Sequence, residues 1–368
     1  MGNLHMMEEI KRQGHLKKTA EAVENALIQC GQDIKNHKIG RVIITGSGDS
    51  YYIGLCARLF FEELCPTCSI EVLSSMEFSK YGLHKADGKT AVIAISISGN
   101  VLRTIECVEQ AQHNGAYVIG ITNNRQSRLA QVAKCPVCLD LDTEPTWTCG
   151  TLTYTGSLYA LARTALALSP LKSPVVQARL DQLNSVLTSL EDVIRESEPV
   201  CRAAARNMRI IGNQPPVLVL GAGPNLGTAK YGAAKFAEIC STLAIGQECE
   251  EFCHGEFWVV ERANLVFVIA PSGKGFSRTV EVAGILRRFG CDLFILSDDA
   301  SLCTLGKFSV LMPSCDEALS PLAYAIPFQL ISYYYSYEKG LNPDTRDHTD
   351  PFRKECSRLL TRGKNTVL

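Results

Sequence analysis

The chain has 368 residues, of which 46% are hydrophobic and 20% are charged, and its formal net charge is −1. This length predicts two domains with a sizeable core, and the near-neutral charge argues against nucleic acid or an anionic membrane surface as a partner. The sequence has no apolar run of membrane-spanning length and no apolar signal segment at its start, so we expect a cytoplasmic protein.

Sixteen cysteines are scattered along the chain. Because no export signal accompanies them, we expect free thiols, most of them buried. Two CxxC pairs, Cys65/Cys68 and Cys135/Cys138, each have the spacing of half a zinc site or of a redox pair. Both pairs fall where strands of the first predicted sheet begin. A strand order of 2-1-3-4-5 would put these strands on opposite edges, so we expect no metal site.

The first half of the chain alternates between strand and helix patterns after a helical segment at residues 7–36. We predict strands at residues 41–45, 69–73, 91–95, 117–122 and 136–141, and helices at residues 51–64, 101–113 and 153–168. This alternation is typical of a parallel, doubly wound sheet with helices on both faces.

The second half shows the same alternation after a linker at residues 169–174. We predict two connecting helices at 175–194 and 199–209, strands at 217–220, 265–269, 292–296 and 309–312, and helices at 228–242, 276–289 and 322–337. The chain then divides into a helical N-terminal segment (1–36), a first α/β domain (37–168), a helical linker (169–212), a second α/β domain (213–345) and a C-terminal tail (346–368).

The two α/β domains resemble each other in sequence. The segment VIITGSGDSYYIGLCARLFFEEL of the first parallels VLVLGAGPNLGTAKYGAAKFAEI of the second, and AISISGNVLRTIE parallels IAPSGKGFSRTVE. Matching strand–turn–helix units in the same order indicate internal duplication of one domain.

The turn after the third strand has the features of a phosphate site. Backbone N–H groups at a helix N-terminus have no intrahelical partner and the helix dipole is positive there. Ser96 and Ser98 add hydroxyl groups, and Gly99 allows close backbone approach to a ligand. The turn at Ser47–Ser50 should lie at the same carboxyl edge of the sheet, where open α/β sheets bind ligands. The alternative is a Ser/Asn helix cap without a ligand.

Lys235 and Glu238 are three residues apart on a predicted helix, so they share one face. The surrounding segment GAAKFAEIC is otherwise apolar or small, which places both charges near packing surfaces. A predicted loop at residues 250–256 contains three acids and His254, all of them proton-transfer groups. These residues favour an acid/base enzyme for a phosphorylated small molecule. A surface ion pair and a solvated loop are the alternatives.

Four motifs carry a resemblance to a known family: GSGDSYY-x-G, SxSGN at a strand end, GAAKFAE and E-x-x-HG. In this order they resemble the tandem sugar-isomerase (SIS) domains, which are flavodoxin-like. The likeness is strongest to the isomerase half of glutamine–fructose-6-phosphate aminotransferase and to its stand-alone deaminase and deglycase relatives. The opening EEIKRQGHLKKT and the segment SMEFSKY also resemble the family.

The resemblance implies that Glu238 is a general base that moves a proton between C1 and C2 of an open-chain sugar, and that Lys235 supports it. His254 would assist ring opening from the partner subunit, so a homodimer is implied. Lys364 resembles the family's lysine before the C-terminus. The sugar- and phosphate-binding set implied by the resemblance is Ser47, Asp49, Ser50, Ser96, Ile97, Ser98, Gly99, Val101, Thr151 and Glu251.

Several positions depart from the family pattern. Val101 stands where threonine is usual, Ile97 where glutamine is usual, and Asp49 where the first turn has threonine. The segment Gly150–Leu152 replaces S-T-K. These changes bear on the substrate more than on the fold.

The expected function is therefore that of an amino-sugar-phosphate deaminase/isomerase, which converts glucosamine 6-phosphate to fructose 6-phosphate and releases ammonia. Without a glutaminase domain or an N-terminal cysteine nucleophile, we expect no nitrogen transfer from glutamine. The alternatives are a fructosamine-6-phosphate deglycase and a non-catalytic phosphosugar sensor, the latter disfavoured by the lack of a basic patch. The glycine spacing after Gly46 fails the dinucleotide fingerprint, so no cofactor is expected.

Overall fold

The computed structural model describes residues 5–16, 23–28, 31, 33, 37–143, 149–210, 216–344 and 351–362. Two compact units make up the chain. The β1–β5 unit contains residues 18–143, 156–180 and 347–368, and the β6–β10 unit contains residues 1–17, 144–155 and 181–346. Each is described by itself.

The β1–β5 unit is built on a parallel sheet in the order β2-β1-β3-β4-β5. Its strands are β1 (Arg41–Gly46), β2 (Ser69–Ser74), β3 (Thr90–Ile95), β4 (Tyr117–Thr122) and β5 (Cys135–Cys138). The helices are α3 (Asp49–Leu64), α4 (Ser75–Glu77), α5 (Leu102–His113), α6 (Arg128–Val132) and α15 (Pro351–Arg362), with parts of α7 (Leu152–Leu168) and α8 (Ser173–Ile210). Strands β3 and β4 are buried along their whole length, which explains their unbroken apolar sequences.

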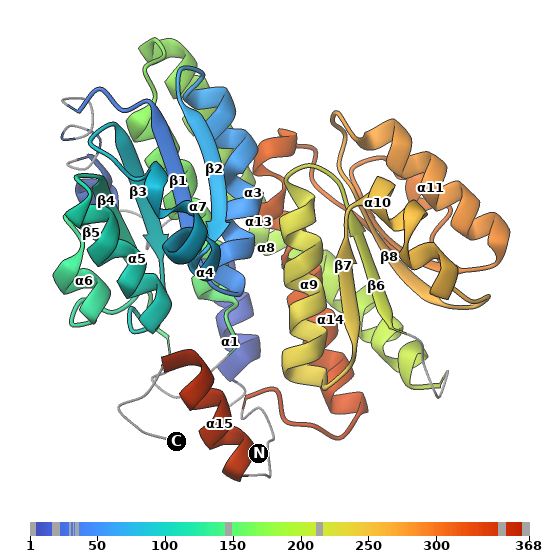
Figure 1. Ribbon diagram of the computed structural model, residues 1–368. Helices are drawn as coiled ribbons and strands as arrows, with labels where there is room; N and C mark the ends of the chain where they lie inside the picture. Colours follow the sequence, from blue (N-terminus) through green and yellow to red (C-terminus); the bar gives the residue numbers. More distant parts are fainter. Residues whose placement is uncertain are drawn as a thin grey trace. The chain divides into compact units, whose positions relative to one another are not determined.

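The β6–β10 unit is built on a second parallel sheet in the order β10-β9-β8-β6-β7. Its strands are β6 (Val217–Gly221), β7 (Ala244–Gln247), β8 (Leu265–Ala270), β9 (Asp292–Ser297) and β10 (Phe308–Leu311). Its complete helices are α1 (His5–Arg12), α9 (Asn225–Cys240), α10 (Cys249–His254), α11 (Phe276–Phe289), α12 (Ala300–Cys303), α13 (Pro321–Tyr324) and α14 (Ile326–Glu338). Figure 1 shows α9 and α14 on one face of this sheet and α10 and α11 on the other.

Both sheets have the same topology when their strands are numbered within each unit. Reading from one edge, each sheet runs second, first, third, fourth, fifth strand. This confirms the predicted doubly wound α/β fold and its duplication. In both units the third strand is followed by a turn and a long helix, α5 or α11.

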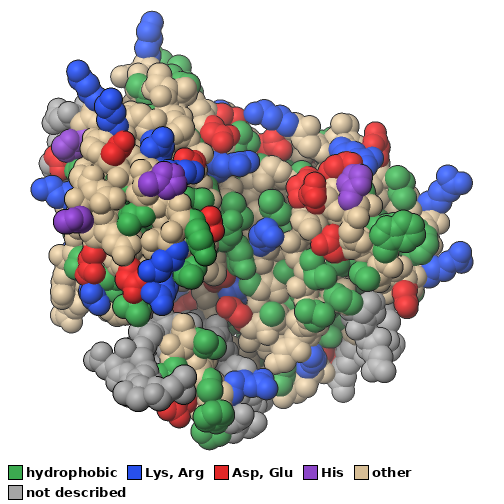
Figure 2. Space-filling view, in the orientation of Figure 1, with side chains coloured by type: hydrophobic (Ala, Val, Ile, Leu, Met, Phe, Trp, Pro, Cys, Tyr) green, Lys and Arg blue, Asp and Glu red, His purple; other side chains and the backbone are tan. Residues whose placement is uncertain are grey.

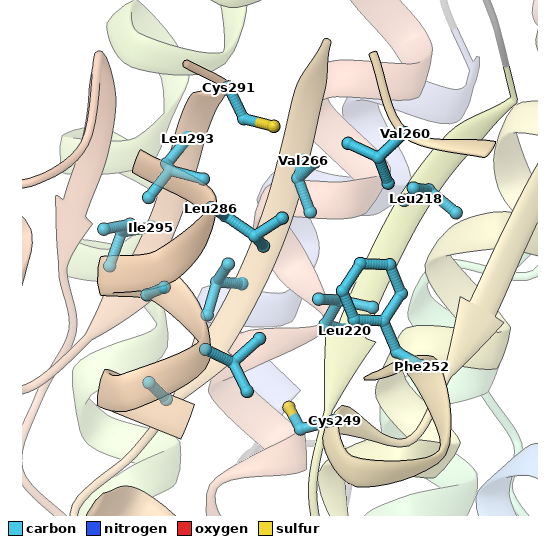
Figure 3. Packing of buried hydrophobic residues seen from close by; sticks show 14 of the residues in the cluster. Leu218, Leu220, Cys249, Phe252, Val260, Val266, Leu286, Cys291, Leu293 and Ile295 are labelled. Carbon is cyan, nitrogen blue, oxygen red and sulfur yellow. The ribbon is translucent and has the colours of Figure 1, made fainter. Parts of the chain in front are cut away.

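The core between the β6–β10 sheet and helices α10 and α11 is a continuous apolar cluster (Figure 3). Phe252 of α10 and Leu286 of α11 are each 1% exposed and pack against side chains from the sheet. Burial of this size stabilises the unit by about 2 kcal/mol for each large apolar side chain. The sheet residues labelled in Figure 3 are Leu218, Leu220, Val266, Leu293 and Ile295.

Helices α4, α6, α12 and α15 were not predicted, and four further details differ from the sequence prediction. Residues 175–194 and 199–209 belong to one helix, α8, which continues through Pro199. A proline inside a helix removes one hydrogen bond and strains the chain by about 3 kcal/mol. Packing on both sides offsets this cost, because Leu190 and Cys201 are fully buried.

The other three differences are local. Strand β7 was not predicted, because it is a short edge strand of four residues without an apolar run. Residues 250–256 form the end of α10 and a 3₁₀ turn (Glu256–Val259) rather than a loop. The predicted helix at 322–337 is divided between α13 and α14. At the N-terminus, residues 5–12 and 23–28 are helical, and most other residues of the predicted segment 7–36 lie outside the described residues.

The cysteines largely follow the prediction. Fourteen of those in the described part of the chain carry free thiols, and nine of these are buried. Cys135 is the exception because it is disulfide-bonded. A disulfide requires two Cβ atoms within about 4.5 Å, which the spacing of cysteines along a sequence does not reveal. The CxxC pairs are associated with β2 and β5, which lie at opposite edges of their sheet as expected.

The surface carries charges of both signs. Figure 2 shows acidic and basic side chains interspersed on the face that it presents, without a large area of one sign. Within the described residues, no helix combines the length and the apolar character needed to cross a membrane.

Candidate functional site

The turn after β3 leads from the buried end of the strand into helix α5. Gly99 has a φ of 63°, in the left-handed region that glycine tolerates. A Cβ atom at this position would lie 2.0 Å from the Oγ atom of Ser127, so no larger residue fits without rearrangement. Gly99 also donates its N–H to the carbonyl of Ser96 and accepts from the N–H of Leu129. The turn is therefore tightly fixed around a backbone position that only glycine can fill.

Ser96 is the most informative residue of this turn. Its side chain is 2% exposed, and its Oγ atom has no hydrogen-bond partner among the described residues. A buried hydroxyl without a partner costs about 1–3 kcal/mol. An anionic ligand oxygen would offset that cost, and the start of α5 provides the positive dipole end that favours an anion.

The remaining predicted residues of this turn occupy different environments. Ser98 is exposed, and its Oγ atom accepts a hydrogen bond from the N–H of Asn100 at 3.3 Å. The carbonyl of Ile97 accepts hydrogen bonds from Thr122 and Asn123, which hold it to the end of β4. Val101 is the N-cap residue of α5 and gives no side-chain cap.

The turn after β1 lies beside the turn after β3. Strands β1 and β3 are paired in parallel, with Thr45 opposite Ala94, so their carboxyl ends meet at one edge of the sheet. Ser47 is exposed, Asp49 is partly buried in the first turn of α3, and Ser50 is buried. The structure thus brings the predicted residues of both turns to one edge of the β1–β5 sheet, as expected for a ligand site in this class of fold.

The corresponding turn of the β6–β10 unit holds a carboxylate of the protein itself. The Oε2 atom of Glu317 accepts the N–H of Lys274 at 3.0 Å, and a Cβ atom on Gly273 would lie 2.3 Å from its Cδ atom. Asp298 accepts two further hydrogen bonds, from the N–H and the hydroxyl of Ser272, at 2.7 and 3.0 Å. The duplicated turns therefore differ: acidic side chains contact the second one, whereas the first contains the Ser96 hydroxyl, which has no partner in the described part of the chain.

Lys235 and Glu238 form a close ion pair on helix α9. The Nζ atom of Lys235 lies 2.6 Å from the Oε2 atom of Glu238. The Lys235 side chain is fully buried, whereas 32% of the Glu238 side chain is exposed. A buried cation behind a partly exposed carboxylate differs from the exposed surface pair that was the alternative, because loss of either partner would leave a poorly solvated charge.

Aromatic rings complete the surroundings of this pair. Lys235 Nζ lies 4.9 Å from the centroid of the Tyr231 ring, which stacks on Tyr154 at a centroid distance of 3.6 Å. The hydroxyl of Tyr231 donates to the carbonyl of Gly150 at 2.7 Å. The segment before α7 also reaches Glu238 directly, because the Cys149 thiol donates to Oε2 at 3.6 Å. Cys149 and the two tyrosines were missed by the sequence analysis, although the four-residue spacing of Tyr231 and Lys235 places them on one helix face.

Thr151 is part of a buried network rather than of an exposed pocket wall. Its hydroxyl donates to the Oε2 atom of Glu9 at 2.9 Å, and both side chains are buried. Nearby, Gln13 donates to Gln329 at 2.6 Å. These polar contacts hold α1 and the start of α7 within the β6–β10 unit.

His254 lies at the end of α10 and is paired with an acid on its own helix. Its Nε2 atom is 3.3 Å from the Oε1 atom of Glu250, and 71% of its side chain is exposed. The Nε atom of Arg278 contacts the other oxygen of Glu250 at 2.6 Å. The guanidinium of Arg278 and, second, the His254 ring hold the pKa of the Glu250 carboxyl below its usual range.

Glu251 is exposed, and its N–H donates to the side chain of the N-cap residue Glu248. Arg278 was not singled out in the sequence.

Two of the predicted acid/base residues, Lys235 and Glu238, are thus in direct contact. The ion-pair partner of His254 is Glu250. Lys364 lies outside the described residues. Among the described residues, no group of three or more histidine, cysteine or acidic side chains has the arrangement of a metal site.

Similar proteins agree with this picture of the fold. The chain is 28% identical over 340 residues to a glutamine–fructose-6-phosphate aminotransferase of Thermococcus kodakarensis. The aligned region covers 92% of this chain and 56% of that protein. It spans about half the length of the curated relatives it matches.

Two solved structures with the same fold have names that include glucosamine. The C-terminal domain of glucosamine–fructose-6-phosphate aminotransferase from Francisella tularensis superposes with a TM-score of 0.78 at 20% identity, over 92% of this chain and 97% of that chain. Glucosamine-6-phosphate deaminase from Thermotoga maritima superposes with a TM-score of 0.74 at 19% identity, over 94% of this chain and 98% of that chain.

The family itself is established by a sequence match in each half of the chain. The SIS domain model matches residues 35–169 and residues 210–339. These two regions contain the two parallel sheets with the same strand order. The chain belongs to the SIS domain family and carries the domain twice.

Proposed function

We propose that this protein is an enzyme of amino-sugar phosphates, a deaminase/isomerase of the glucosamine 6-phosphate to fructose 6-phosphate type. The observation that carries the proposal is the Lys235–Glu238 pair, in which a fully buried cation holds a carboxylate that remains 32% exposed. A phosphosugar sensor has no need of a positioned base. The membership of the SIS family and the names of the similar proteins support a sugar phosphate as the substrate class.

In the proposed reaction Glu238 acts as the general base on the open-chain aldose. It removes the proton from C2 of the 2-amino aldehyde, the electron pair forms the C1–C2 double bond, and the C1 oxygen takes a proton from water, which gives an enolamine with a hydroxyl at C1. Glu238 then returns the proton to C1, which gives the 2-imine of fructose 6-phosphate. Water adds to C2 of this imine and ammonia leaves. One carboxyl group serves both proton transfers, because it carries the proton from C2 until it delivers it to C1, and Lys235 holds it in position.

The phosphate role is assigned to the turn after β3 in the β1–β5 unit. It rests on the buried hydroxyl of Ser96, which has no partner among the described residues, on the N-terminus of helix α5 and on the backbone conformation at Gly99. Backbone N–H groups at a helix N-terminus and one hydroxyl can bind the phosphate dianion, and this needs no positively charged side chain.

His254 is proposed to act in a second copy of the chain, so the active protein is a homodimer. The 71% exposure of its side chain supports this role, because a residue that serves a partner subunit lies on the surface of its own chain.

An assay with two substrates tests the proposed reaction. Glucosamine 6-phosphate and a fructosyl-amino-acid 6-phosphate are offered separately to the purified protein, and ammonia and free amino acid are measured. We expect ammonia and fructose 6-phosphate from the first. If only the fructosyl-amino-acid 6-phosphate reacts and releases free amino acid, the protein is a deglycase and not a deaminase. No product from either, together with a ligand-dependent rise in melting temperature, would identify a sensor.

Ser96→Ala tests the phosphate site. We expect the affinity for a sugar phosphate to fall about tenfold to a hundredfold, since a hydrogen bond to a charged group is lost. The unliganded variant should be as stable as the wild type or slightly more stable, because the substitution removes a buried hydroxyl that has no partner among the described residues. The affinity is measured by isothermal titration calorimetry and the stability by urea unfolding.

Ser197→Ala is a matched control for that experiment. Ser197, on α8, is also fully buried, and its Oγ atom likewise has no partner in the described part of the chain. Its loss should leave the affinity unchanged. If the wild type and Ser96→Ala bind the sugar phosphate with equal affinity, the turn after β3 does not bind the phosphate group.

A further inference from the structure

The thiol of Cys149 contacts the proposed catalytic carboxylate. Cys149 is fully buried, and its Sγ atom donates to the Oε2 atom of Glu238 at 3.6 Å. The ammonium of Lys235 contacts the same oxygen at 2.6 Å. A carboxylate oxygen has two lone pairs, so these two donors account for the hydrogen-bonding capacity of Oε2.

The residues after Cys149 fix the position of its thiol. The carbonyl of Gly150 accepts the hydroxyl of Tyr231, at 2.7 Å, from the same helix that carries Glu238. The hydroxyl of Thr151 donates to buried Glu9 at 2.9 Å. The segment is therefore held to α9 and to α1 immediately beyond the thiol, which restricts the movement of Cys149 relative to Glu238.

We propose that Cys149 is a positioning residue for Glu238. Together with Lys235 it holds Oε2 toward the protein interior, so that Oε1 is the oxygen that exchanges a proton with the substrate carbon. A thiol suits this task because it is a weak, neutral donor. It fixes the rotation of the carboxylate, whereas a second cation at the same oxygen would make Glu238 a weaker base. This role rests on the proposed function of Glu238.

Cys149→Ala removes the donor and tests the proposal. We expect kcat to fall about tenfold while KM changes by less than about twofold, because the orientation of the base is lost and substrate binding is not. The acid limb of the pH profile of kcat should move to higher pH, since the ionised carboxylate has lost a hydrogen bond. Cys149→Ser retains a hydroxyl donor and should keep the wild-type acid limb. Cys149→Val, which is close to cysteine in size and has no donor, provides the same test if the alanine variant does not fold.

Cys201→Ala is the matched control. Cys201 is a fully buried thiol on α8 that donates to the carbonyl of Pro327 at 3.3 Å. Its removal creates a similar cavity and should leave the acid limb unchanged. An acid limb and a kcat equal to those of the wild type in Cys149→Ala, in an enzyme that Glu238→Gln inactivates, would overturn the role of Cys149 alone. Wild-type turnover in Glu238→Gln would overturn the proposed function and this role together.

Discussion

Replacing Glu238 by glutamine should lower turnover by a factor of about 10² or more while the sugar phosphate still binds. The amide has nearly the same size as the carboxylate and can still accept the hydrogen bond from Lys235, but it cannot take up a proton from carbon. The variant separates proton transfer from binding. Steady-state kinetics give kcat, and calorimetric titration with the substrate gives the affinity.

Glu281→Gln controls for the loss of an ion pair on a helix. Glu281 pairs with Arg278 three residues before it, at 2.9 Å, which is the same spacing as that between Lys235 and Glu238. Its side chain is exposed, and turnover should not change. If Glu238→Gln retained wild-type turnover, the proton-transfer mechanism would be wrong.

The same variant tests whether the site is shared between subunits. Co-expression of Glu238→Gln with His254→Ala should restore about a quarter of the wild-type activity, because half of the dimers are mixed and each mixed dimer has one intact site. Activity that stays at the level of the two single variants would place His254 in the site of its own chain or outside the site.

Gly99→Ala should destabilise the protein and abolish binding of the sugar phosphate. A non-glycine residue at a φ of 63° costs about 1–2 kcal/mol. The new Cβ atom would also lie 2.0 Å from Ser127 Oγ and 2.3 Å from Ser127 Cβ, so the turn must shift, at a further cost of about 1–3 kcal/mol. A shift of this turn displaces the hydroxyl of Ser96 and the N–H groups before α5. Urea unfolding measures the first effect and calorimetric titration the second.

Gly340→Ala separates these two contributions. Gly340 follows α14 with a φ of 73°, and a Cβ atom there would have no heavy atom within 4 Å among its described surroundings. The control should lose only about 1–2 kcal/mol and bind the ligand normally. Equal losses of stability in the two variants would contradict the steric account of Gly99.

The sequence was sufficient for the fold because apolar runs and turn residues recur in the same order in both halves. It placed the turns after β1 and β3 at one edge of a sheet, which the pairing of Thr45 with Ala94 confirms. It failed at α8, because a proline usually ends a helix and the packing that stabilises residues 173–210 is tertiary.

The surroundings of the acid/base pair were harder to predict. The contact between Cys149 and Glu238 joins residues 89 positions apart, and no local pattern specifies it. The exposed position of His254 depends on α10, a helix too short to show a clear period.

The carboxylate of Glu317 makes the second of the duplicated turns a poorer anion site than the first. A built-in acid at one turn repels any phosphate that approaches it, so two copies of one turn need not bind the same ligand. The copy with Glu317 also carries Lys235 and Glu238 on the helix after its first strand. Under the proposed function, the β1–β5 copy therefore binds the phosphate, and the copy with Glu317 supplies the acid/base pair.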